Sequence, residues 1–390
     1  MKKWWFALII ELFMIMAFAI IYFRFDVLPA IILGDNPANR FTTTEETVAD
    51  SSEEQDATEQ PFIETIYLTT EEAPITTITI SGAGDCTFGR DVEQGYALSY
   101  DSYYDKHGAG YFFKNVKHIF QADDLSIVNF EGTLTKRGAR QDKTWAFKGK
   151  TEYLNTLIEG GIEAVGFDNN HSKDYGTVSY TDTMDAFDEY GIYYASRDIA
   201  SVYEAKDIRI GMVAINALTG GSNAENRLLS AMEKIRESSC DMIVVSFHWG
   251  EEGSPNVTGK QKSLGKMAID EGANLVLGHH PHILQGIEEY NGAYIVYSLG
   301  NFAFGGNKNP SDFDTMIFQQ TFSFQDGELL DTMNAQIIPC SISSVSNINN
   351  FQPIVLENDA KQRVIDKINK RSQNFNIIVN DDGKISAINQ

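Results

Sequence analysis

The chain has 390 residues, of which 43% are apolar, so it can bury the core of one large domain or of two ordinary ones. Its formal net charge of −23 argues against nucleic acid as a partner, because phosphate backbones are bound by surfaces of Lys and Arg. Cys86, Cys240 and Cys340 are odd in number and widely spaced, which excludes a disulfide framework and a CxxC zinc site.

An apolar segment near the N-terminus is the first predicted element. A lysine pair precedes a run from Trp4 to Phe23 that Glu11 alone interrupts, and about 20 apolar residues are enough to span a bilayer. Basic residues before such a run keep the N-terminus in the cytoplasm. We therefore expect residues 1–25 to be a single-pass signal anchor in the cell membrane, with the bulk of the chain extracytoplasmic. A cleaved signal peptide is the alternative, with a cleavage site near Ala19.

Residues 26–75 are the next predicted segment. From residue 36 on, the segment is rich in Thr, Glu, Ser and Asp, and Arg40 is its one basic residue. Like charges repel, and such a composition cannot bury enough apolar surface to fold alone. We expect a disordered stalk that tethers the domain that follows.

Strands and helices are predicted to alternate from Ile75 onward, which is typical of a layered α/β domain. We assign residues 76–340 to this domain and residues 341–390 to a C-terminal extension with a helix over Lys361–Arg371. The expected strands cover Ile75–Ser81, Leu125–Asn129, Ala164–Phe167, Ile208–Ile215, Asp241–Phe247, Asn274–Leu277, Ala293–Ser298, Thr315–Phe324 and Asn334–Pro339. The expected helices cover Thr151–Glu159, Tyr180–Tyr190, Asn226–Ser238 and Gly259–Glu271.

Potential metal ligands follow several of these strands. Any one of them is more often structural, but α/β proteins place their sites at the carboxyl ends of strands, so we expect these side chains to lie together. Carboxylate and imidazole ligands suit Mn, Zn or Fe better than a thiolate site does. The pattern indicates a centre for one or two divalent metal ions. The strand-end residues are Asp85, Glu131, Asn170 with His171, His248, and the pair His280 and His282.

These motifs resemble those of the CapA family of poly-γ-glutamate capsule synthesis proteins, which is similar to the calcineurin-like metallophosphoesterases. The resemblance spans about residues 76–305 and implies a four-layer α/β/β/α sandwich around a two-metal site. It also implies a role in the synthesis, export or attachment of an anionic capsule polymer. The motifs that carry it are Gly84–Arg90, Asn129–Gly132, Asn169–Gly176, His248–Glu251, Gly278–His282 and Tyr297–Phe302.

The resemblance further implies a role for each motif residue. His171 would be the general acid that protonates a leaving oxygen, and Asp174 either orients His171 or is a solvated turn residue. Asp85 and His282 would hold the first metal, Glu131 would bridge, and Asn170, His248 and His280 would hold the second. Substrate-binding candidates are Arg90, Lys148, Ser298 and Asn301.

The sequence departs from the phosphoesterase pattern in two places. Those enzymes usually carry Asp-x-His in the first motif, whereas Asp85 is followed by Cys86 and Thr87, so one imidazole is missing. Glu131 stands where Asp is usual, and its longer side chain alters the metal spacing. We therefore expect the first metal position to be short of ligands. We interpret Cys86 as a small buried residue.

A basic run follows Glu131 in an otherwise acidic domain. Such a run is commonly a solvated face, but its place beside the predicted site makes it a candidate for binding a polyanion such as polyglutamate. Its members are Lys136, Arg137, Arg140, Lys143, Lys148 and Lys150.

Two functions are left open at this point. One is metal-dependent hydrolysis or transfer at a phosphoester or related anionic group, in a protein that works with an anionic extracellular polymer and with capsule synthase subunits. The other is a non-catalytic accessory subunit of a membrane polymer synthase or exporter, which the missing imidazole favours. A plain phosphodiesterase unrelated to capsule rests on superfamily analogy alone.

Overall fold

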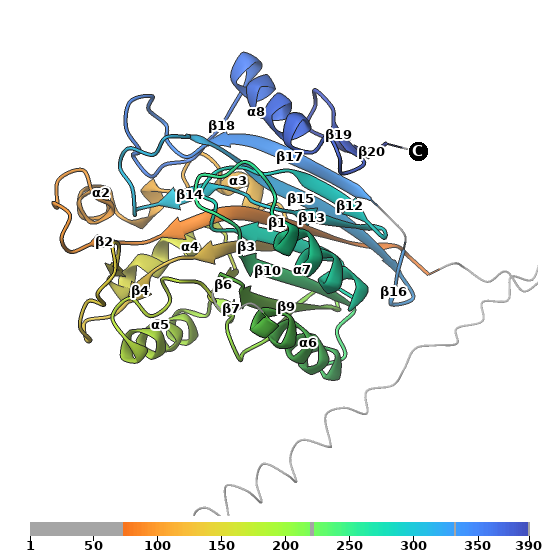
Figure 1. The fold of residues 1–390 in the computed structure, drawn as a ribbon, viewed down its shortest axis with the longest axis horizontal. Coiled ribbons are helices and arrows are strands. Elements are labelled where there is room, and N and C mark those ends of the chain that lie inside the picture. Colours follow the sequence, from red (N-terminus) through yellow and green to blue (C-terminus); the bar gives the residue numbers. More distant parts are fainter. Residues whose placement is uncertain (1–72, 219–221, 331–332, 389–390) are drawn as a thin grey trace, which may run out of the picture. The chain divides into compact units, whose positions relative to one another are not determined.

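The computed structural model describes residues 73–218, 222–330 and 333–388. The predicted anchor and nearly all of the predicted stalk lie outside these residues. Within the described ranges, no helix is both long enough and apolar enough to cross a membrane. The described chain folds into two large β-sheets with helices on their outer sides (Figure 1).

The first sheet has nine strands and is centred on β1 (Thr76–Thr87). Strand β1 runs parallel to β3 (Leu125–Phe130) on one side and antiparallel to β15 (Asp314–Gln325) on the other. The remaining strands are β6 (Ala164–Gly166), β7 (Tyr193–Ala195), β14 (Asn301–Phe304), β16 (Glu328–Leu329), β17 (Asn334–Ser341) and β18 (Ile354–Val355).

The second sheet has six strands in the order β12-β13-β11-β10-β9-β8. Its four inner strands are parallel to one another and buried, as expected of strands that are covered on both faces. They are β9 (Ile208–Asn216), β10 (Met242–His248), β11 (Leu275–His279) and β13 (Ala293–Val296), and the antiparallel edges are β8 (Ser201–Ala205) and β12 (Ile287–Tyr290).

Three apolar cores separate the layers. The inner core joins the two sheets through residues such as Ile80 and Leu277. An aromatic-rich core lies between the first sheet and its helices, and a third core lies between the second sheet and its helices. The mixed α/β fold expected from the sequence is confirmed, in the layer order α/β/β/α. The helices are α2 (Tyr100–His107), α3 (Lys117–Phe120), α4 (Asn155–Gly160) and α5 (Thr177–Tyr190) on the first sheet, and α6 (Ser222–Glu237) and α7 (Gly259–Asp270) on the second.

The chain after β18 packs into the same unit. Helix α8 (Asn358–Arg371) and the hairpin of β19 (Ile377–Val379) and β20 (Ile385–Ala387) contribute apolar side chains to the inner core. Smaller elements complete the fold: a three-stranded sheet of β2 (Arg90–Asp91), β5 (Phe147–Gly149) and β4 (Thr133–Leu134), and the 3₁₀ turns Ala109–Tyr111 and Thr151–Leu154.

The predicted elements are present, with ends that differ by a few residues. The largest difference is β1, which was expected to end at Ser81 but continues to Thr87. It can continue because the glycines after Ser81 admit close neighbours: a Cβ on Gly84 would lie 2.0 Å from the carbonyl oxygen of Gly300. Strand β1 therefore carries Asp85 within the sheet rather than on a following loop.

Candidate metal centre

The metal ligands predicted from the sequence meet where the carboxyl ends of strands from both sheets come together. Asp85 lies near the end of β1, and His248 is the last residue of β10. Glu131 follows β3, and its backbone N–H donates to the carbonyl oxygen of Cys86 at 2.8 Å. That bond holds Glu131 beside β1.

The Glu131 carboxylate lies at the middle of the cluster. Its Oε1 atom is 3.6 Å from Nε2 of His171 and 3.8 Å from Nε2 of both His248 and His282. The side chain is fully buried, and neither oxygen has a hydrogen-bond partner among the described residues. Burial raises the pKa of Glu131 to about 8. A buried carboxylate without donors is costly, so these oxygens fit a bound cation.

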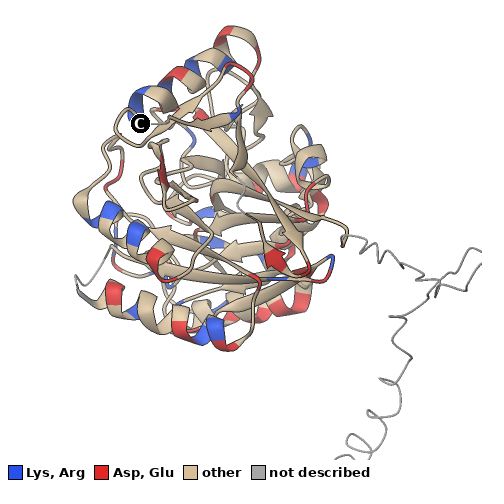
Figure 2. Cartoon of the chain, turned by 90° about the vertical axis from the view of Figure 1, so that its right-hand side faces the viewer, with Lys and Arg blue, Asp and Glu red and all other residues tan. Residues whose placement is uncertain are grey.

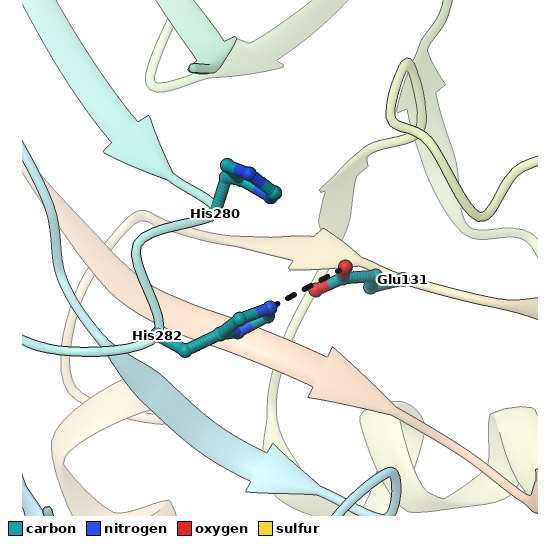
Figure 3. Close-up of side chains that lie close together, drawn as sticks. All are labelled: Glu131, His280 and His282. Carbon is teal, nitrogen blue, oxygen red and sulfur yellow. Dashed lines mark ion pairs between the residues drawn. The ribbon is translucent and has the colours of Figure 1, made fainter. Parts of the chain in front are cut away.

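The loop after β11 brings two imidazoles to Glu131. Ligand atoms of Glu131, His280 and His282 all lie within 4.8 Å of one another (Figure 3). His280 and His282 have φ values of 96° and 57°, which non-glycine residues seldom adopt and which persist only where the surroundings fix them. Burial lowers the pKa of His280 to about 4, so its ring is neutral, which is the form that binds metals.

His282 is oriented through its other nitrogen. Its Nδ1 atom lies 3.1 Å from Oδ2 of Asp85 and 2.9 Å from Oδ1 of Asn301, which leaves Nε2 directed at Glu131. Burial alone would lower the pKa of His282, but the carboxylates of Glu131 and Asp85 raise it to about 10. A partner of this kind on the far nitrogen is typical of metal-binding histidines.

Asp85 is a fully buried carboxylate with several partners. Its Oδ1 atom accepts a hydrogen bond from Nδ2 of Asn129 at 2.9 Å and lies 3.4 Å from Nδ1 of His279. Burial would raise the pKa of Asp85, but His279 and His282 hold it well below its usual range. Asp85 is therefore ionised, as a metal-binding carboxylate must be.

His248 and Asn170 form a contact on the opposite side of the centre. Nε2 of His248 is 2.7 Å from Oδ1 of Asn170, and the ring centroids of His248 and His280 are 4.7 Å apart. Burial lowers the pKa of His248 well below its usual value, so this ring too is neutral. Glu251, in the same motif as His248, is exposed. The far nitrogen of His248 lies 3.4 Å from the Asn129 amide.

A second group of residues holds His171. Nδ1 of His171 is 2.7 Å from Oδ2 of Asp174, so its Nε2 atom is presented to Glu131. Asp174 also accepts from Nζ of Lys143 at 2.8 Å and from the backbone N–H of Phe147 at 2.6 Å. Burial lowers the pKa of His171, although Asp174 opposes this shift. The geometry gives Asp174 an orienting position and not that of a solvated turn residue.

A cavity of about 250 Å³ opens beside the centre. Its lining includes three aromatic residues, the half-exposed Trp145 together with Phe147 and Phe304, as well as polar side chains. His171, His282 and Asn301 line it, together with Glu252 and Asp312. A substrate in this cavity would therefore meet the imidazoles directly.

Three of the four substrate-binding candidates do not line this cavity. Arg90 pairs with Asp101 at 3.0 Å, and Nζ of Lys148 lies 4.3 Å from the ring centroid of Tyr175. Both lie on the three-stranded sheet of β2, β5 and β4, which the sequence pattern did not reveal. Ser298 is fully buried and donates to the carbonyl oxygen of Ile283, in the loop after β11 that carries His280 and His282. Only Asn301 is placed where a substrate could touch it.

The basic run after Glu131 is largely used within the fold. Four of its six cations pair with carboxylates of the same domain, so most of the run is not an open surface for a polyanion. The pairs are Arg137 with Asp182, Arg140 with Asp91 at 2.7 Å, Lys143 with Asp174 at 2.8 Å and Lys150 with Asp105 at 3.0 Å.

Two asparagines at the centre belong to the sequence motifs, but neither was assigned a role of its own from the sequence. Asn129 contacts both Asp85 and His248, and Asn169 donates to the carbonyl oxygen of Phe130 at 2.7 Å and accepts from the backbone of His171. A signal for Asn129 existed, because residues two apart in a strand share a face and Glu131 follows at that spacing. Asn169 sits in an irregular turn, where no such pattern applies.

The donor set as a whole fits a divalent cation. The buried oxygens of Glu131 have no donor among the residues described here, and Nδ1 of the neutral His280 ring has no partner among them either. Hard oxygen and imidazole ligands together suit Mn, Zn or Fe. Thr87, where the phosphoesterase pattern has an imidazole, is buried with an unpartnered Oγ1 atom.

Comparison with known proteins gives a family match. The family model described as "Bacterial capsule synthesis protein PGA_cap" matches residues 79–306. The capsule biosynthesis protein CapA of Bacillus anthracis is 29% identical over 253 residues, which are 58% of this chain and 60% of that protein. The PGA biosynthesis protein CapA of Bacillus subtilis is 30% identical over 248 residues, 58% of this chain and 63% of that protein. Each match thus spans less than two thirds of the relative.

Solved structures give weaker likenesses. A phosphatase from Mycoplasma pneumoniae is 15% identical with a TM-score of 0.44, and the match covers 68% of this chain and 94% of that one. A hypothetical protein from Thermus thermophilus is also 15% identical, with a TM-score of 0.41, covering 67% of this chain and 98% of that one.

Proposed function

Because this chain belongs to the PGA_cap family of bacterial capsule synthesis proteins, we propose that it acts in the synthesis, export or attachment of an anionic capsule polymer of the poly-γ-glutamate type. We propose further that it does so through metal-dependent hydrolysis or transfer at a phosphoester or related anionic group. One observation carries the second step: the buried Glu131 carboxylate has no donor among the described residues and faces imidazoles from the opposite sheet.

The chain's own residues divide the proposed chemistry between them. Glu131, His280 and His282 would hold a divalent ion, with Asp85, His248 and Asn170 at hand for a second. Such an ion supplies Lewis-acid polarisation of the anionic group. His171 keeps Nδ1 against Asp174 and lines the cavity, where the protonated form of its ring would deliver a proton to a leaving oxygen.

Elemental analysis of the purified full chain tests this proposal. We expect one to two metals per chain and hydrolysis of a generic phosphodiester, with both lost in Glu131→Gln. The exposed Glu189→Gln on α5 changes the same chemical group and should change neither measurement. His171→Ala should keep its metal and lose turnover. A His171→Ala protein of unchanged activity would refute the general-acid role.

A second candidate function is that of a non-catalytic accessory subunit in a membrane polymer synthase or exporter. It is favoured by Thr87, which leaves the first metal position one imidazole short. In that case the full chain would hold one metal or none and show no turnover. Thr87→His should then raise metal content without creating activity, whereas activity in wild type would exclude this candidate.

The location of the protein is a separate proposal. We propose a single-pass cell-membrane protein with its bulk outside, supported by the apolar run from Trp4 to Phe23 after a lysine pair. Capsule synthase subunits and the anionic polymer are its proposed partners. A protease added to intact cells should cleave a chain tagged at its C-terminus. Full protection of the tag would contradict this orientation.

A further inference from the structure

A second cavity, larger than the one at the metal centre, lies between the start of α7 and the end of α8. Its volume is about 640 Å³. We call it the basic pocket, because Lys262, Lys367, Lys370 and Arg371 line it and Asp366 is its one acidic lining residue. The amides of Gln373 and Asn374 add hydrogen-bond donors. In a chain with a net charge of −23, this concentration of cations calls for a physical reason.

Three of these four cations, Lys262, Lys370 and Arg371, have no carboxylate partner among the described residues. Nζ of Lys262 lies 5.1 Å from the ring centroid of Phe375, and neither Lys262 nor Lys370 forms an ion pair with any described residue. This is the reverse of the basic run after Glu131, whose cations are mostly paired. Acidic and basic residues are interspersed over the domain (Figure 2). A group of lysines without carboxylate partners is therefore not what the average surface of this domain would provide.

The basic pocket and the metal-centre cavity share a wall. Asp312 lines the metal-centre cavity and pairs at 2.8 Å with Lys367, which lines the basic pocket. The loop 252–257 lines the metal-centre cavity with its first residues and the basic pocket with its last. A ligand of several units that crosses this wall can therefore occupy both cavities.

The loop 252–257, which lines both cavities, is hydrogen-bonded to the loop after β11 that carries His280 and His282. The backbone N–H of Gly253 donates to the carbonyl oxygen of Pro281 at 2.9 Å. The side-chain amide of Gln285 donates to the carbonyl oxygens of Ser254 at 2.9 Å and Asn256 at 3.1 Å. The position of the basic pocket relative to His280 and His282 is thus set by hydrogen bonds within one short stretch of chain.

We propose that the basic pocket binds a carboxylate of a polycarboxylate chain whose neighbouring units lie in the metal-centre cavity. This inference rests on the proposed function, since it takes an anionic polymer as the ligand. Lys262 and Lys370 supply point charges for the carboxylate. Arg371, whose fork suits carboxylate and phosphate alike, is half-buried and donates to the carbonyl oxygen of Leu284, so it is less available than the two lysines.

Fluorescence anisotropy with a labelled decamer of γ-linked glutamate tests the pocket on the full chain. We expect Lys262→Gln/Lys370→Gln to weaken binding about tenfold, since each exposed ion pair contributes modestly. The matched control is Lys114→Gln/Lys117→Gln, which removes the same charge from exposed lysines outside the pocket and should leave binding unchanged. Added salt should narrow the difference between wild type and the pocket variant.

Separate readouts distinguish this inference from the proposed function. Lys370 lies in the last turn of α8, where its charge also complements the negative end of the helix dipole. The melting temperatures of both double variants are therefore measured. If the Lys262→Gln/Lys370→Gln protein does not fold, Lys262→Gln alone is used in its place. Equal decamer binding by wild type and the pocket variant would overturn the inference, even in an active phosphodiesterase. Lysine-dependent binding without any turnover would leave the pocket standing and refute the hydrolase. Tighter, equally lysine-dependent binding of polyphosphate would overturn the assignment to carboxylate.

Discussion

The two sheets contribute unlike groups to the metal centre. The first sheet supplies the carboxylates of Asp85 and Glu131, and the second supplies the imidazoles of His248 and His280. Among the described residues, Asp85 and His248 have hydrogen-bond partners, whereas the oxygens of Glu131 and Nδ1 of His280 have none. We infer that the partnered groups set the geometry and that the unpartnered groups are the ones that need a cation.

Weakening the apolar core between the two sheets should have the largest effect, and the quantity affected is the free energy of unfolding. Leu277 of β11 packs against Gly82 of β1, so Leu277→Ala leaves a cavity in the core between the two halves. We expect a loss of about 2–5 kcal/mol in the free energy of unfolding of the metal-free chain. Urea unfolding measures it, with the half-exposed Leu229→Ala on α6 as the control. A normal stability with weakened metal binding would show that the halves are not joined through this core.

The next largest effect is expected on metal binding, when one of the unpartnered groups is removed. His280→Ala deletes a candidate ligand from the second sheet, and Glu131→Gln neutralises one from the first. We expect each to weaken metal binding by about 100-fold or more, because loss of a direct ligand exceeds the 10- to 100-fold typical of outer residues. Calorimetric titration of the full chain checks this, with the exposed His107→Ala as a matched control. Wild-type affinity in either variant would remove that residue from the centre.

Loosening a residue that supports the ligands should have a smaller effect. The Asn129 amide contacts both Asp85 and His248, and hence both sheets. We expect Asn129→Ala to weaken metal binding about 10- to 100-fold while the number of metals bound at saturation stays the same. A reduced stoichiometry would instead make Asn129 a ligand.

The smallest predicted effect concerns a partly buried acid in the turn before β3, for which no imidazole contact is found among the described residues. Asp123 precedes β3 as Glu131 follows it, and burial raises its pKa to about 7. The folded state therefore binds a proton that the unfolded state has lost, so this group's contribution to stability falls as pH rises toward 7. We expect a loss of up to about 1 kcal/mol per pH unit between pH 5 and 7, absent in Asp123→Asn. An equal pH slope in both proteins would contradict the shift.

Much of the fold and part of the site could be predicted from the sequence. Apolar runs located the parallel strands, and because such strands share one edge, Asp85, Glu131, His248 and His280 were expected together and are found together. Whether they bind metal stays a prediction. The anchor, the stalk and the cellular location also stay predictions, since they concern residues outside those described.

The rest depends on irregular chain that has no periodic signal. Arg90 and Lys148 were expected beside the substrate, but they are partners in a sheet of two- and three-residue strands, too short to leave a pattern. Lys143 reaches Asp174 from a loop 31 residues away in sequence, a contact that only tertiary packing sets. The basic pocket is lined by residues of α7 and α8 that are more than 90 residues apart in sequence. A search for basic residues close together in sequence therefore found the run after Glu131 and not this pocket.

Strand β1 also sets the distance between the upstream chain and the metal centre. Thr76 and Asp85 lie toward opposite ends of this strand, a separation of about 30 Å at about 3.3 Å per residue. The chain before Thr76 is therefore attached far from the metal centre, and a tether upstream would pull on the distal end of the sandwich. A change in the length of that tether would change the distance between the metal centre and the point of attachment. It would not change the arrangement of the candidate metal ligands.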